Sequence, residues 1–191
     1  GTPVGNTLET LYGFAASGNH RGADGVYLFN WMDINDWPVS GNDYKRLLKY
    51  GVATKFVTGV PRRHPVCFRD AVPAGFSMNV QLPAEARAGK RFRVHIGPRP
   101  GSGQAEVIVG FAKRKDLADS RFRVSLNGLD LKMAGDLADT KMIGGAAARA
   151  IRFHCPLDPV KRGYNEIGVQ QFAGSTGQQV VWVEIRLDPN D

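Results

Sequence analysis

The chain has 191 residues, enough for one hydrophobic core or for one core with an appendage. Its composition, 42% hydrophobic and 23% charged, is typical of a globular protein, and no stretch approaches the roughly 20 apolar residues that a membrane span needs. The net charge of +7 favours acidic partners such as nucleic acid, anionic glycan or a membrane surface, with solubility alone as the alternative.

The first predicted elements are a helix, a buried strand and a second helix. Asn6 to Glu9 resembles a capping box and begins a helix that Gly18 can end. Residues 22–31 read GADGVYLFNW, and their apolar run does not alternate, which is typical of a strand buried on both faces in a parallel sheet. A second helix is predicted over residues 42–50. The rest of the chain shows no further strand of this kind, so the parallel neighbours of this strand are missing from the sequence.

From about residue 53 the apolar pattern changes to a period of two, which predicts half-buried strands. Asn127-Gly128 is a strong hairpin dipeptide between two of them. Met133 to Ala148 lacks periodicity and is predicted to be a loop, with at most one helical turn. The fold class is therefore predicted as mainly β, an antiparallel β-sandwich with an N-terminal helix–strand–helix appendage. The predicted strands are Phe76–Leu82, Phe92–Ile96, Val107–Phe111, Phe122–Leu126, Leu129–Leu131, Ile151–Cys155, Tyr164–Val169 and Val181–Leu187.

The sequence offers little for catalysis or metal binding. Cys155 falls on the apolar parity of a strand and is predicted to be a buried free thiol, with a disulfide to Cys67 as the alternative. The four histidines are scattered, and no zinc spacing or nucleophile elbow occurs, so we assign no catalytic residue, no metal ligand and no cofactor. A structural calcium is the weaker alternative to ordinary turns for four loop aspartates, namely Asp116, Asp119, Asp136 and Asp139.

Basic side chains on two predicted strands form a candidate binding face. If the strands share a sheet, their outward positions and the connection between them give a cationic surface for sulfated or uronic-acid polysaccharide. Nucleic acid is the weaker choice, because interleaved aromatic residues are lacking. A solvated outer face, partly neutralised by nearby acids, is the interpretation that the sequence favours most. The residues are Arg91 and Arg93, then Lys113 and Arg114, then Arg121 and Arg123.

Two stretches resemble known families. GADGVYLFNW and the helix that ends in Leu47–Gly51 resemble the last strand and helix of a (β/α)8 barrel, most similar to uncharacterised bacterial proteins related to glycoside hydrolases. The resemblance implies that residues 1–52 are the end of a barrel whose other strands lie in an upstream domain. It places Asn30, Trp31 and Asp33 at the carboxyl end of a strand, where an intact parent barrel would bind substrate. It carries over no catalytic carboxylate.

The second resemblance covers about residues 75–187 and is to the galactose-binding-like jelly roll that accompanies glycosidases. It is carried by FRVSLNGLDL at residues 122–131, by residues 159–167 and by residues 180–187. It implies that residues 53–191 form an accessory β-sandwich domain, and it favours a secreted or periplasmic protein.

Together these features lead us to expect a non-catalytic accessory domain of a glycoside-hydrolase-like protein, which binds carbohydrate or buttresses the barrel. The alternative is a purely structural or protein-interaction sandwich with no glycan site. A small complete enzyme, with its site between the Trp31 loop and the sandwich, is the weakest hypothesis, because no convergent set of acid, base or nucleophile appears.

Overall fold

The computed structural model describes residues 7–25, 54–66, 81–141, 143–144 and 146–190, together with positions 42, 45, 46 and 49, which are helical as predicted. The predicted buried strand at 26–30, Cys67 and most of the predicted strand Phe76–Leu82 lie outside the described residues. No helix in the described part of the chain is long and apolar enough to cross a membrane.

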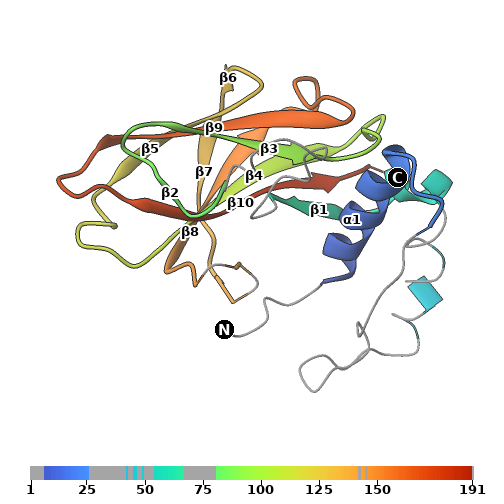
Figure 1. Cartoon of the computed structure of the whole chain (residues 1–191), viewed down its shortest axis with the longest axis horizontal. Helices are drawn as coiled ribbons and strands as arrows, with labels where there is room; N and C mark the ends of the chain where they lie inside the picture. Colours follow the sequence, from blue (N-terminus) through green and yellow to red (C-terminus); the bar gives the residue numbers. More distant parts are fainter. Residues whose placement is uncertain are drawn as a thin grey trace, which may run out of the picture.

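Two antiparallel sheets form the body of the molecule, as the alternating pattern predicts (Figure 1). The first sheet has six strands, in the order β1 (Arg62–Pro65), β10 (Gln179–Asp188), β4 (Gln104–Phe111), β8 (Arg149–Cys155) and β7 (Lys132–Asp136), with β2 (Ala84–Glu85) also paired to β10. The second sheet has the order β3 (Lys90–His95), β9 (Tyr164–Ala173), β5 (Arg121–Leu126) and β6 (Leu129–Asp130).

The core fills the space between the two sheets. The predicted inward positions of β4 are fully buried at Val107, Val109 and Phe111. The ring of Phe111 stacks on that of Phe122 from the opposite sheet, with centroids 3.9 Å apart. Each such side chain contributes about 1.5–3 kcal/mol relative to an exposed position, so these contacts hold the two layers together.

Two strands depart from the predicted parity. In β9 the inward position is Asn165, which is 2% exposed, whereas Tyr164 lies on the outer face. Tyr164, the apolar residue that begins the predicted strand, therefore lies outside the core. Asn165 tolerates burial because its amide bonds to both the N–H and the carbonyl of Lys161 and to the Asn127 amide. In β10 a bulge after Val180 turns Val180, rather than Val181, towards the core.

The segment predicted to be a loop begins with a strand. Lys132 to Asp136 pairs with β8 as β7, the edge strand of the first sheet. A bulge between Met133 and Gly135 and exposure of both faces remove the alternation that would have predicted this strand. Within the loop that follows, Ile143 is buried against Ile108 on the outer face of β4.

Helix α1 (Leu8–His20) packs on the sandwich beside β1, at the right of Figure 1. Its N-cap is Thr7, one residue later than predicted, and the Thr7 hydroxyl accepts a bond from the Thr10 N–H at 3.1 Å. The 3-10 helix η1 (Thr54–Gly59) leads into β1. The domain boundary at residue 52 stays a prediction, because it lies outside the described residues.

Glycines allow α1 to approach the edge strands of both sheets. A Cβ on Gly13 would lie 2.0 Å from the carbonyl oxygen of Arg63 in β1. A Cβ on Gly97, just after β3, would lie 2.4 Å from the carbonyl oxygen of Ala16. Because real Cβ contacts this short do not occur, both positions require glycine. The helix therefore covers the edge where β1 of one sheet meets β3 of the other.

Candidate functional site

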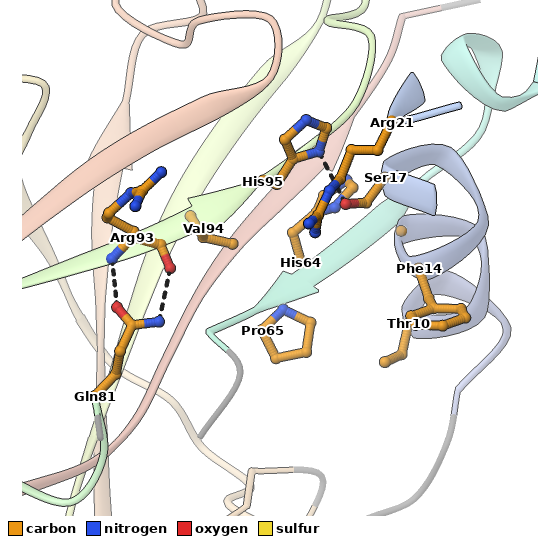
Figure 2. A pocket seen from close by; sticks show the side chains of 11 residues that line it. Thr10, Phe14, Ser17, Arg21, His64, Pro65, Gln81, Arg93, Val94 and His95 are labelled. Carbon is orange, nitrogen blue, oxygen red and sulfur yellow. Dashed lines mark hydrogen bonds between the residues drawn. The ribbon is translucent and has the colours of Figure 1, made fainter. Parts of the chain in front are cut away.

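A pocket of about 140 Å³ lies between α1, β1 and β3 (Figure 2). Helix α1 supplies its outer wall and the two edge strands supply its inner wall. Side chains from these elements line it, among them Phe14, Ser17, Arg21, His64, Arg93 and His95.

The Gln81 side chain holds the inner wall of the pocket, because it pairs with the backbone of β3 as a neighbouring strand would. Arg93 lies on the free edge of β3, and the Gln81 amide pairs with its backbone in both directions (Figure 2). The Gln81 Oε1 accepts from the Arg93 N–H at 2.6 Å, and the Gln81 Nε2 donates to the Arg93 carbonyl at 3.1 Å. These bonds satisfy the edge at this point and hold the Arg93 side chain on the outer face.

A chain of polar contacts joins the helix to β3 and to the turn before β9. The Ser17 Oγ lies 2.9 Å from the His95 Nδ1, and the His95 Nε2 lies 3.3 Å from the His20 Nδ1. The Arg162 Nε donates to the His20 Nε2 at 2.8 Å. Since arginine can only donate, neutral His20 carries its proton on Nδ1 and donates to His95, which in turn donates to Ser17. The Gly97 N–H lies 3.2 Å from the His95 Nδ1 as well. A bond from this N–H needs an unprotonated Nδ1, so it competes with the bond from His95 to Ser17.

Two basic residues of β1, Arg62 and His64, are buried, and His64 lines the pocket. His64 is 3% exposed, and burial holds its pKa well below the usual range, helped by the positive charge of Arg62. Arg62 is itself 1% exposed, and burial lowers its pKa to about 10. Its Nη2 donates to the Pro98 carbonyl at 3.0 Å, whereas its Nε and Nη1 have no hydrogen-bond partner among the described residues. His64 is therefore neutral near pH 7, which avoids a second buried charge beside Arg62.

Two exposed aromatic side chains mark what we call the pocket mouth, Phe14 in the pocket lining and Tyr164 against the lining residues Arg93 and His95. Phe14 of α1 is 63% exposed and Tyr164 of β9 is 37% exposed. The guanidinium of Arg93 lies 4.2 Å from the centre of the Tyr164 ring, and that of Arg21 lies 5.9 Å from it. The edge of the His95 ring also packs against Tyr164. Aromatic faces and cations are thus interleaved here.

Sequence reasoning missed both aromatic residues of the pocket mouth. Tyr164 entered the sequence analysis only as the first residue of a predicted strand, because the burial of Asn165, which turns Tyr164 outward, is not visible in an apolar pattern. Phe14 lies outside the apolar stripe of α1, and an aromatic residue on the polar side of an amphipathic helix is the signal that could have identified it.

The predicted cationic face is brought together in part. The strands β3 and β5 share the second sheet, on either side of β9. Arg91 lies 3.4 Å from Glu166, and Arg123 lies 3.7 Å from Asp130, in exposed ion pairs. Arg121 donates to backbone carbonyls in its own loop.

The other two predicted members of the cationic face are Arg114 and Lys113. Arg114 forms an ion pair with Glu85 of β2, in the first sheet, at 2.9 Å. Lys113 is exposed. Asn30, Trp31 and Asp33, predicted for the substrate site of a parent barrel, lie outside the described residues.

Three of the four aspartates considered for calcium, Asp116, Asp136 and Asp139, have partners within the protein. Asp136 forms an ion pair with Arg149 at 3.0 Å, and Asp116 accepts bonds from Ser175 and Thr176. The described residues contain no group of three or more His, Cys, Asp or Glu side chains that could hold a metal ion. Cys155 is free and buried, as predicted, and burial raises its pKa to about 12.

No family model and no curated protein matches this sequence. Among solved structures, a beta-porphyranase of glycoside hydrolase family 86 from the human gut bacterium Bacteroides plebeius is similar at 14% identity and a TM-score of 0.45, over 68% of this chain and 20% of that one. A second family 86 chain, in complex with neoagarooctaose, gives 15% identity and a TM-score of 0.44, over 66% of this chain and 18% of that one.

A family 35 carbohydrate-binding module from Clostridium thermocellum is similar at 19% identity and a TM-score of 0.35, over 65% of this chain and 90% of the module. This chain therefore spans about a fifth of the length of the family 86 chains. Similarities at this level carry no argument about function, and the β-sandwich rests on the strand pairings described above.

Proposed function

We propose that the chain is a non-catalytic accessory β-sandwich domain of a glycoside-hydrolase-like protein and that it binds carbohydrate at the pocket mouth. The observation that carries this proposal is the exposure of Phe14 and Tyr164 beside Arg21 and Arg93. A sugar ring presents an apolar C–H face, which gains from contact with an aromatic ring, and hydroxyl groups, which accept bonds from guanidinium groups.

The accessory role is supported by the resemblance of residues 1–52 to the end of a barrel. It is supported as well by the side chains of the pocket, which are basic, neutral polar or apolar. The described residues that line the pocket include no carboxylate, whereas glycoside hydrolysis uses a pair of them. Any hydrolytic chemistry is thus assigned to an upstream barrel domain, which would be the partner of this sandwich.

An anionic polysaccharide is the ligand class that the arginine face supports. Arg93 belongs both to the pocket and to the outer face of the second sheet, so a glycan bound at the mouth would continue over that face. The ion pairs of Arg91 and Arg123 are exposed, and exposed pairs contribute only about 0–1 kcal/mol. A sulfate or uronate group could therefore replace the protein carboxylate at little cost.

Calorimetric titration of the chain with neutral and anionic oligosaccharides tests the proposal. Tyr164→Ala and Phe14→Ala should each weaken binding by about threefold to tenfold, the loss of one aromatic contact. Phe172→Ala is the matched control, because Phe172 is 64% exposed near the far end of β9. Absence of binding at millimolar concentrations would refute a carbohydrate-binding role and favour a structural or protein-interaction sandwich.

A further inference from the structure

Three basic side chains meet beside the pocket, from parts of the chain that are far apart in sequence. His20 ends α1, His95 ends β3 and Arg162 precedes β9. Their ring and guanidinium nitrogens lie 2.8 Å and 3.3 Å apart in a continuous chain. None of the three faces the core between the sheets.

The backbone holds this cluster rigidly. Gly163, next to Arg162, donates to the Gly97 carbonyl at 2.9 Å and accepts from the Ile96 N–H at 2.9 Å. A Cβ on Gly163 would lie 3.7 Å from both histidine rings, so the turn passes close against them. Arg162 is therefore presented from a fixed turn rather than from a loose loop.

The cluster concentrates positive charge. Arg21 and Arg93 approach the Tyr164 ring next to His95, and Arg162 lies on the other side of the histidine pair. No described carboxylate contacts His20 or Arg162, and the nearest acid of β9, Glu166, forms an ion pair with Arg91. Arg21, Arg93 and Arg162 all carry a positive charge near pH 7, and an anion bound beside them would be attracted by these charges.

We propose that Arg162, held beside the His20–His95 pair, is the centre of an oxyanion site that takes one sulfate-ester or carboxylate group. Arg162 uses only its Nε within the protein, and its exposed Nη1 and Nη2 groups can donate to two oxygens of one oxyanion. The assignment of this group to a glycan rests on the proposed function, whereas anion binding itself does not.

Inorganic sulfate is the first probe, added to the whole chain and followed by amide NMR shifts. We expect saturable shifts at residues 20–21, 95–97 and 162–164. Arg162→Gln should weaken sulfate binding at least about tenfold, because a bidentate charge-assisted contact is lost. Lys161→Gln removes the same charge one residue away and should change binding less than about twofold. Equal effects of the two substitutions, or shifts spread over the whole surface, would overturn the site.

Sulfated, uronate-containing and neutral oligosaccharides of equal length then identify the group that is bound. We expect an anionic oligosaccharide to bind more tightly than its neutral counterpart, and Arg162→Gln to remove this preference while leaving neutral binding unchanged. Equal binding of all three would overturn this inference but leave carbohydrate binding standing. Binding of inorganic sulfate at the cluster without binding of any oligosaccharide would support the oxyanion site and refute the proposed function.

Discussion

Glu184 lies on the outward parity of β10, yet its side chain is fully buried between two arginines. Arg63 approaches it within 2.9 Å and Arg186 within 2.6 Å. A carboxylate without exposure to water depends on these partners, and they in turn depend on it.

Glu184→Gln should lower the free energy of unfolding by about 3 kcal/mol, because it removes the carboxylate charge that pairs with the nearly buried Arg63. The matched control is Glu106→Gln in the neighbouring strand β4. Glu106 lies 3.8 Å from Arg152 in a partly exposed pair, so this change should cost less than about 1 kcal/mol. Urea unfolding of both variants provides the comparison, and equal losses would contradict a special role for Glu184.

His64 makes stability depend on pH. Its folded-state pKa lies well below the unfolded value of 6.5, mainly through burial, so the unfolded chain takes up the proton first as the pH falls. The contribution of neutral His64 to the free energy of unfolding is fully present above pH 6.5. Below that pH it is lost, by about 1.4 kcal/mol for each pH unit.

Urea unfolding at about pH 7.5 and about pH 5.5 measures this loss, and His64→Gln should reduce the difference between the two conditions. Only the change in this difference between the two proteins reports on His64. An unchanged difference would show that His64 is protonated equally well in the folded protein.

At the scale of elements, the seat of α1 on β1 depends on the absence of a side chain at position 13. Gly13→Ala should cost about 1–3 kcal/mol, as overpacking does, because the new Cβ meets the Arg63 carbonyl. Gly18→Ala lies in the same helix, where a Cβ would meet only Ala23 at 3.9 Å. That control should be neutral or stabilising by up to about 1 kcal/mol, from helix propensity.

Thermal unfolding and the rate of trypsin cleavage after Arg21 would measure both glycine variants. If α1 lifts from the edge strands in Gly13→Ala, cleavage should accelerate in that variant alone. Equal cleavage and equal stability would mean that the helix does not depend on this close approach.

The strands of the sandwich could be predicted from the sequence where one face meets the core and the other meets water. Val107, Val109 and Phe111 alternate with less apolar residues, and this local period is the direct consequence of strand geometry. The prediction was wrong where this condition fails. An edge strand exposed on both faces, such as β7, shows no apolar period. A buried polar side chain with its own hydrogen bonds, such as Asn165, hides which face of its strand points inward.

At the scale of the whole molecule, the net charge of +7 predicts how binding depends on salt. Raising the NaCl concentration from about 50 mM to about 500 mM should weaken an anionic oligosaccharide by about tenfold, because exposed charges are screened. The same change should alter binding of a neutral oligosaccharide by less than about twofold, since stacking on Phe14 and Tyr164 does not depend on charge. Calorimetry at the two salt concentrations makes the test, and equal salt effects would contradict electrostatic recognition.

The sequence by itself determined the class of fold, the hairpin at Asn127-Gly128, the buried thiol of Cys155 and the basic outward positions of β3 and β5. Each of these follows from residues that are neighbours in the chain, because periodicity and turn geometry are local properties. The candidate site could not be predicted from such local patterns. His20 contacts His95 across 75 positions and Arg162 across 142 positions, so their meeting depends on long-range packing.

Only the tertiary structure decided where α1 lies, and this placement creates the pocket. The helix is amphipathic by sequence, but its pattern does not say which surface it covers. The backbone approaches at Gly13 and Gly97 fix it on the edge between the two sheets. The sequence shows which face of a helix is apolar and will be buried. Which element covers that face depends on the whole fold.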